Sequence, residues 1–210
     1  GPVAAAARQL SAERPGLTGI AMLADGPAAF AARVALIDAA RATIDAQYYI
    51  WHADLTGSIL LEALKRAADR GVRVRLLVDD NGLSGLDREL AQLAAHPNAA
   101  VRLFNPFMLR WPKWLNHLFD FRRLNRRMHN KALIADGAAV IMGGRNIGDA
   151  YFGAGDATIF VDLDVIAVGD AAPEVQEDFE RYWRCEAAVD AARILGAHAG
   201  GDPIGARAAM

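Results

Sequence analysis

Cysteine is almost absent from this sequence of 210 residues, which contains only Cys185. One cysteine excludes an internal disulfide and does not identify the compartment, because cysteine-poor chains occur in all compartments. Long apolar runs are also missing, since none reaches the roughly 18–20 residues that a membrane-spanning helix needs. The start, Gly1-Pro2-Val3-Ala4, lacks the segments of a signal peptide. Because Gly1-Pro2 also matches a protease-cleavage scar, this absence does not establish a free cytosolic protein.

An excess of charge of one sign is missing as well. The formal net charge is −2, and 53% of the residues are hydrophobic and 23% charged, which is typical of a globular domain with a sizeable core. A charge so close to zero argues against the whole molecule as an electrostatic nucleic-acid binder. Any basic function must therefore be local.

Apolar periodicity and turn residues predict an alternation of helices and strands. In chain order the expected elements are a helix from Pro27, a strand over 43–51, a helix from Thr56 to about Gly71, a strand over 72–78, a turn over 79–82, a helix over about 85–94, strands over 101–104, 131–135, 139–142 and 161–168, and a helix over 173–183. Residues 1–15 are expected to form a tail or a loose helix. This order predicts an α/β fold with a mixed, largely parallel sheet and helices on both faces.

Three residues near the predicted strand over 131–135 suggest phosphodiester chemistry. His129 and Lys131 are two apart and would share a strand face. An imidazole attacks phosphorus as a nucleophile, and an ammonium beside it offsets the charge of the transition state. Asp136 is an odd number of residues from both, so it is expected to face away and to support the turn.

A second group of candidate residues lies between positions 143 and 164. Gly143-Gly144 would let the backbone approach a ligand closely, and Asn146 offers an amide donor to a phosphate oxygen. Asp162 and Asp164 share one face of a predicted strand, where one of them would orient a histidine. Each residue alone suits an ordinary surface, turn or strand position, but the joint order favours one site.

This order resembles the HxKxxxxD signature of the phospholipase D superfamily, which HNKALIAD at 129–136 meets. The segments that extend the resemblance to the amino-terminal half of bacterial cardiolipin-synthase-like proteins are TIDAQYYIW, DRGVRVRLLVDDNG, VRLFNPF, RLNRRMHNK, GGRNIGDAYF and DLDVIAVG. The resemblance implies a phospholipase-D-like catalytic lobe over 28–186, a lead-in over 1–27 and a peripheral segment over 187–210.

The resemblance also implies roles for individual residues. His129 would be the nucleophile or its acid/base counterpart, and Lys131 and Asn146 would bind the phosphate. Asp164, with Asp162 second, would orient a histidine. No metal and no cofactor is implied. The family's active site joins two HxKxxxxD motifs, whereas this sequence contains one. We expect a second lobe, either in the carboxyl-terminal half of a longer chain or in a homodimer partner.

Basic and aromatic residues alternate between Arg110 and Lys131, where seven Lys or Arg residues accompany one acid. The residues expected to contact a membrane or an anionic substrate are Arg110, Trp111, Lys113, Trp114, Arg126 and Arg127. An interfacial element that binds anionic lipid is one interpretation. A groove for nucleic acid and an amphipathic helix that covers the core are the others.

The resemblance and the residues together favour phosphatidyl transfer or phospholipid hydrolysis through a phosphohistidine, with cardiolipin synthesis as the specific expectation. The expected partner is an anionic phospholipid, and nucleic acid is not expected. The expected setting is peripheral to a bacterial cytoplasmic membrane, on a side that the sequence leaves open. The alternatives are a dimeric nuclease and an inactive lobe that docks on a membrane or a partner protein.

Overall fold

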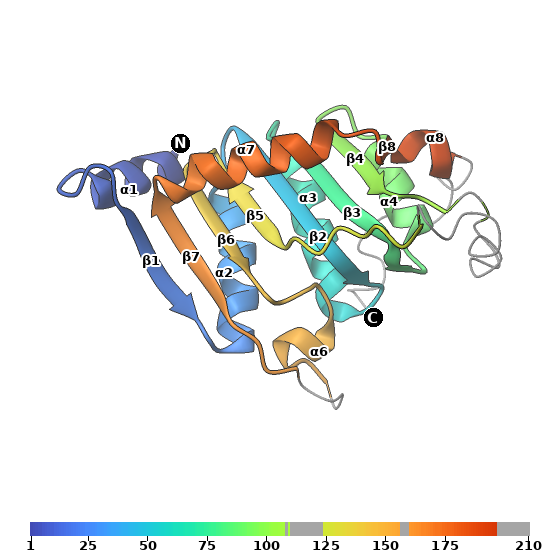
Figure 1. The fold of residues 1–210 in the computed structure, drawn as a ribbon, viewed down its shortest axis with the longest axis horizontal. Coiled ribbons are helices and arrows are strands. Elements are labelled where there is room, and N and C mark those ends of the chain that lie inside the picture. Colours follow the sequence, from blue (N-terminus) through green and yellow to red (C-terminus); the bar gives the residue numbers. More distant parts are fainter. Residues whose placement is uncertain (108, 110–123, 156–159, 197–210) are drawn as a thin grey trace.

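A computed structural model describes residues 1–107, 109, 124–155 and 160–196, and these form one eight-stranded sheet covered by helices (Figure 1). The strands are β1 (Thr18–Leu23), β2 (Thr43–His52), β3 (Arg73–Ser84), β4 (Ala99–Phe104), β5 (Ala132–Ala135), β6 (Ala139–Gly143), β7 (Asp164–Gly169) and β8 (Ala188–Asp190). The helices are α1 (Pro2–Ser11), α2 (Gly26–Ala39), α3 (Leu55–Asp69), α4 (Asp87–Ala94), α6 (Asp149–Phe152), α7 (Ala171–Arg184) and α8 (Ala191–Leu195). The strand order across the sheet is β1-β7-β6-β5-β2-β3-β4-β8.

The mixed α/β class is confirmed, but the expectation of a largely parallel sheet is wrong. Only the neighbours β2–β3 and β3–β4 are parallel, whereas β1–β7, β7–β6, β6–β5, β5–β2 and β4–β8 are antiparallel. The cause lies in the second half of the chain, where a tight turn at Asp136 and Gly137 joins β5 to β6. A turn this short permits only antiparallel pairing, because a parallel pair needs a long crossover.

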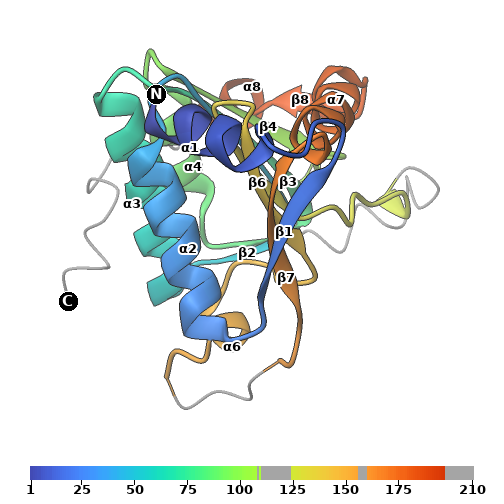
Figure 2. The ribbon, with the colours of Figure 1, turned by 90° about the vertical axis from the view of Figure 1, so that its left-hand side faces the viewer.

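Helices cover both faces of the sheet, as predicted (Figure 2). On one face α2, α3 and α4 bury the larger apolar cluster, and on the other α7 packs Phe179 and Trp183 against a smaller one. Alternation along β2 assigns its side chains to these faces. Ile44, Ala46 and Tyr48 join the larger cluster. The polar residues between them, Asp45 and Gln47, face α7, so β2 carries polar groups under that helix.

The turn expected over 79–82 is not a turn. Instead β3 continues to Ser84, with a shift in its pairing to β2 between Tyr48 and Ile50. Gly82 is needed there for close approach, because a Cβ at this position would lie 2.0 Å from the backbone oxygen of Tyr49. Asp79 therefore lies inside the sheet, fully buried, and not on a surface turn.

Two strands were not expected from the sequence, and they form the two edges of the sheet. β1 pairs with β7, and β8 pairs with β4. Residues 1–15, expected as a tail or loose helix, contain α1, which packs against β1 and β7. The sheet thus extends beyond residues 28–186 on both sides. Within the described residues, no helix combines the length and hydrophobicity needed to cross a bilayer.

Candidate active site

His129 and Lys131 lie side by side just before β5. The ammonium Nζ of Lys131 is 3.1 Å from Nδ1 of His129, and it donates a hydrogen bond of 2.6 Å to the backbone oxygen of the same residue. The predicted proximity of the two side chains is confirmed. Its expected cause was wrong, because both residues precede β5, which begins at Ala132, and so do not alternate along it.

The ring of Tyr49 forms one side of this pair. Its centroid lies 5.0 Å from the imidazole centroid of His129 and 5.7 Å from Nζ of Lys131. Tyr48, Tyr49 and Trp51 lie in the strand predicted over 43–51. Tyr48 and Trp51 are buried, whereas Tyr49 is partly exposed and lines the site.

Lys131 is a buried cation, with only 7% of its surface exposed. Burial lowers the pKa of its ammonium, although the negative charge of Asp162 raises it. A partly desolvated cation interacts more strongly with an anion than an exposed one, because the local dielectric is low. A cavity of about 570 Å³ adjoins Lys131 beneath α7, lined by Gln47, Asn130, Met142, Asp178 and Arg181 among others.

Asp136 lies at the opposite end of β5 from His129. Its backbone adopts a positive φ of 52°, and its carboxylate accepts hydrogen bonds from the backbone N–H groups of Arg41, Ala42 and Thr43. These bonds fix the entry into β2. The structure therefore places Asp136 as a support for the turn and the strand, and does not bring it to the histidine.

The glycines of the second group make room for another part of the chain. A Cβ at Gly144 would lie 1.8 Å from Oδ1 of Asp162, and one at Gly143 would lie 2.3 Å from Oδ1 of Asp164. The segment that closely approaches the glycine pair is therefore the start of β7. Binding of phosphate by the backbone of Gly144 stays a prediction.

The side chain of Asn146 links two parts of the site. Its Oδ1 accepts a hydrogen bond of 3.0 Å from the backbone N–H of Ile50, in β2, and its amide donates one of 3.3 Å to the hydroxyl of Tyr151. These bonds fix the orientation of the amide. Within the described residues the amide donates no further hydrogen bond, and binding of a phosphate oxygen by its second N–H stays a prediction.

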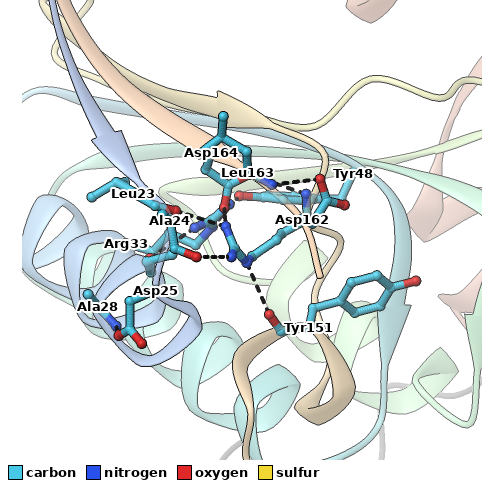
Figure 3. A network of polar contacts seen from close by, with 12 residues as sticks. Leu23, Ala24, Asp25, Ala28, Arg33, Tyr48, Tyr151, Asp162, Leu163 and Asp164 are labelled. Atoms are coloured by element: carbon cyan, nitrogen blue, oxygen red, sulfur yellow. Dashed lines mark hydrogen bonds and ion pairs between the residues drawn. The ribbon is translucent and has the colours of Figure 1, made fainter. Parts of the chain in front are cut away.

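Asp164 lies in a buried network with two arginines (Figure 3). Its Oδ2 is 2.9 Å from Nη2 of Arg33 and 3.3 Å from Nη1 of Arg145, and its Oδ1 accepts a hydrogen bond from the backbone N–H of Arg145. Tyr48 accepts a hydrogen bond from Nε of Arg33, and burial raises the pKa of this phenol. Arg145 also donates to the backbone oxygens of Leu23, Ala24 and Tyr151.

The sequence predicted that Asp164 orients a histidine, but the structure places it with the arginines. Within the described residues the hydrogen bonds and ion pairs of its carboxylate all go to Arg33 and Arg145. The charge of Asp162 raises the pKa of the Lys131 ammonium. Arg33 was missed, although a signal existed, since it lies on the buried face of α2 with Ala29 and Ile37.

The residues predicted to contact a membrane or an anionic substrate do not all have the same environment. Arg110, Trp111, Lys113 and Trp114 lie outside the described residues. Arg126 is exposed, in agreement with a surface role. Arg127 instead turns inward, where it pairs with Asp79 at 3.0 Å and lies over the ring of Phe107. In the described part of the chain, no group of three or more His, Cys, Asp or Glu residues is arranged to hold a metal.

A family model described as "Cardiolipin synthase, PLD-like domain" matches residues 34–183, which is more than half of the chain. The chain belongs to this family. It is 50% identical over 193 residues to cardiolipin synthase C of Escherichia coli, covering 92% of this chain and 41% of that protein. It is also 32% identical over 165 residues to cardiolipin synthase A of Pseudomonas entomophila, covering 78% of this chain and 33% of that protein. The chain thus spans well under half the length of these relatives.

Solved structures show the same fold in more distant proteins. NucT from Helicobacter pylori superposes with a TM-score of 0.61 at 15% identity, covering 83% of this chain and 99% of that one. Phosphatidylserine synthase from Haemophilus influenzae gives a TM-score of 0.61 at 17% identity, covering 93% and 46%. At these identities the likeness concerns the fold alone.

The buried network yields a prediction for stability. Asp164→Asn leaves two buried guanidinium groups without their anion, so the free energy of unfolding is expected to fall by about 3–5 kcal/mol. Urea denaturation measures this change. Asp69→Asn is the control, because Asp69 pairs with Lys65 on the surface, where ion pairs contribute little. Equal effects of the two substitutions would contradict a special role for the network.

Proposed function

We propose that this lobe provides half of the active site of an enzyme that transfers or hydrolyses phosphatidyl groups through a phosphohistidine, with cardiolipin synthesis as the specific reaction. Family membership supports phosphodiester chemistry in general. The observation that carries the finer proposal is the contact between the imidazole of His129 and the ammonium of Lys131. A nucleophile and a cation in contact can engage the same phosphate.

The proposed reaction has two steps. In the first, an imidazole nitrogen of His129 attacks the phosphorus, a P–N bond forms, and the P–O bond to the leaving alcohol breaks. In the second, the hydroxyl of another lipid, or water, attacks the phosphohistidine and restores the free imidazole. Lys131 and the amide of Asn146 would hold the non-bridging oxygens and offset their charge in the transition state. Exclusion of water would decide between transfer and hydrolysis.

Protonation of the leaving alcohol in the first step needs a general acid, and the attacking hydroxyl of the second step must give its proton to the same group; a histidine of the second HxKxxxxD lobe would serve both steps. The chain spans 41% of the length of cardiolipin synthase C, so a longer protein has room for such a lobe. A homodimer would supply it equally.

The sheet offers a surface that a second lobe would cover. Ile20 pairs with Ala167, which lies in the cluster under α7, so Ile20 and Met22 face the α7 side. Both are exposed, and Leu163 beside them is half exposed. Exposed apolar residues on the face that carries the catalytic pair favour burial against another protein surface.

We propose that the enzyme binds peripherally to a bacterial membrane, where its phospholipid substrate lies. Exposed Arg126, three residues before His129, supports attraction of an anionic headgroup. The net charge of −2 does not favour nucleic acid as the substrate. A nuclease remains the alternative that the assay below tests.

The proposed nucleophile gives a prediction for activity. In the full-length protein, or in the dimer if the chain forms one, His129→Ala is expected to lower kcat on phosphatidylglycerol vesicles by at least about 10³-fold, because the substitution removes the imidazole proposed to form the P–N bond. The product phospholipids are measured by mass spectrometry. His96→Ala is the control, since His96 pairs with Asp69 away from the motif.

Three outcomes of this assay would contradict the proposal. Full turnover by His129→Ala would exclude the nucleophile. Hydrolysis of nucleic acid with no action on lipid would favour the nuclease. Vesicle binding that survives His129→Ala, with no turnover in any assembly, would indicate a docking lobe.

The buried ammonium gives a prediction for pH. Only the charged form of Lys131 attracts a phosphate, so kcat/KM is expected to fall as pH rises through its lowered pKa, below the value of about 10.4 for an ordinary lysine. Asp162 raises this pKa, so Asp162→Asn is expected to move the alkaline limb to still lower pH. A pH profile of kcat/KM for both proteins checks this. An alkaline limb at the same pH in both would exclude Lys131 as its source.

A further inference from the structure

Two polar side chains from the sheet hold the segment that leads into His129. We propose that Asp79 and Asn105 are positioning residues that fix the backbone of 126–128 and thereby the place of the catalytic imidazole. This inference rests on the proposed function of His129. Residues 126–131 form neither helix nor strand, so no regular hydrogen-bond ladder holds them.

Asp79 is the central group of this arrangement. Its carboxylate is fully buried in β3, where Oδ2 accepts a hydrogen bond of 3.0 Å from the backbone N–H of Met128. Oδ1 accepts one from the backbone N–H of Asn81 and pairs with Nη1 of Arg127 at 3.0 Å. Burial raises the pKa of this carboxyl, and the bonds from Met128 and Arg127 oppose the rise. The charged form of Asp79 is therefore stabilised by the same segment that its carboxylate holds in place.

Asn105 holds the preceding peptide group. It follows β4 directly, with a positive φ of 45° that asparagine tolerates better than most residues. Its side-chain amide donates a hydrogen bond of 2.5 Å to the backbone oxygen of Arg126, and its own backbone oxygen accepts one from Arg127. Arg126 and Met128 are thus held through their backbone groups, and Arg127 through its guanidinium, by Asp79 within β3 and Asn105 just after β4.

The position of His129 depends on its backbone more than on its side chain. The ring is exposed, and among the described residues its contacts are Tyr49 and Lys131. On the other side, Asn130 donates a hydrogen bond to Asp178 of α7. A shift of about 1 Å at a reacting group can cost roughly 100-fold in rate. Loss of the anchors at 126–128 would allow such a shift.

The sheet contains a second buried ion pair that does not contact the segment before His129 and can serve as a control. Asp45 and Arg75 form an ion pair at 2.6 Å, and their side chains are 2% and 12% exposed. The corresponding values for Asp79 and Arg127 are 0% and 13%. The other partners of the Asp45 pair are Glu180 and Gln176 of α7. Substitution of either aspartate therefore breaks a comparable buried pair, and only one of them touches the segment before His129.

The experiment compares Asp79→Asn with Asp45→Asn in the full-length protein. An asparagine at 79 keeps the shape but must turn an N–H toward one of the donors that now bind the carboxylate. We expect both variants to lose similar stability in urea. For Asp79→Asn, kcat per folded molecule on phosphatidylglycerol vesicles should fall about 10- to 100-fold with KM unchanged. For Asp45→Asn it should remain at the wild-type value.

A second readout does not depend on turnover. With ¹⁵N-labelled histidine, the ring signals of His129 should move or broaden in Asp79→Asn, while those of His52 and His96 stay in place. Equal losses of kcat in the two aspartate variants, or unmoved His129 signals in Asp79→Asn, would overturn the proposal. A wild-type protein without phospholipid turnover would contradict the proposed function, and the histidine signals would still decide the positioning role.

Asn105→Gly provides a variant that keeps the fold if Asp79→Asn does not. Glycine adopts the positive φ without strain, so the substitution removes the side-chain bond to Arg126 while the backbone stays compatible. We expect a fall in kcat with unchanged KM and displaced His129 signals. Wild-type kcat together with wild-type signals in this variant would overturn the role of Asn105.

Discussion

The ion pair between Asp164 and Arg33 joins parts of the chain that lie 131 residues apart, and the geometry of the second group depends on it. The same carboxylate accepts a hydrogen bond from the backbone of Arg145, next to Asn146. Without Asp164, two guanidinium groups would remain buried with no anion, which is far more costly than an unpaired charge in water. The amide that is proposed to bind phosphate therefore takes its position from charges that do not touch the substrate.

Buried or bonded carboxylates also support the segment around His129, Lys131 and Asp136. Asp79 and Asp136 are carboxylates that accept hydrogen bonds from backbone N–H groups of irregular segments. A sheet supplies rigid positions for these acids, and each acid replaces the hydrogen bonds that a loop cannot make to itself. The proposed catalytic pair, His129 and Lys131, thus lies on an irregular segment, whereas the residues that support it lie on or beside strands.

The part of the site that is local in sequence could be predicted, and the part that is distant could not. His129 and Lys131 are only two residues apart, so their side chains can meet without any long-range contact, and the predicted proximity held although the strand begins later. Asp136 was expected to face away from them, and its bonds to residues 41–43 agree with this. Asp79 was read as a turn residue, because Asp-Asp-Asn-Gly has the composition of a turn. Its partners Arg127 and Met128 lie 48 and 49 residues away, and no local pattern encodes them.

In the fold, too, local features could be predicted from the sequence, whereas features set by distant pairing could not. The longer helices and most inner strands follow from apolar periodicity and were predicted nearly to their ends, whereas β3 continues well beyond its predicted end, to Ser84. The direction of the strands from β5 onward was not predicted. The parallel arrangement of the first half was expected to continue, but β5 and β6 form a hairpin and are therefore antiparallel. β1 has four exposed residues in succession and no alternation, so only its pairing with β7 defines it as a strand.

The distance along the chain between Arg33 and Asp164 has a consequence for folding order. Contacts between residues close in sequence form early, whereas those that close long loops form late. During synthesis, α2 and β2 leave the ribosome long before β7. Arg33 therefore has no access to Asp164 while most of the other strands are synthesised. When the start of β7 docks against Gly143 and Gly144, the edge strand β1 also gains its partner. Docking of β7 therefore completes the network around Asp164 and this edge of the sheet in one event.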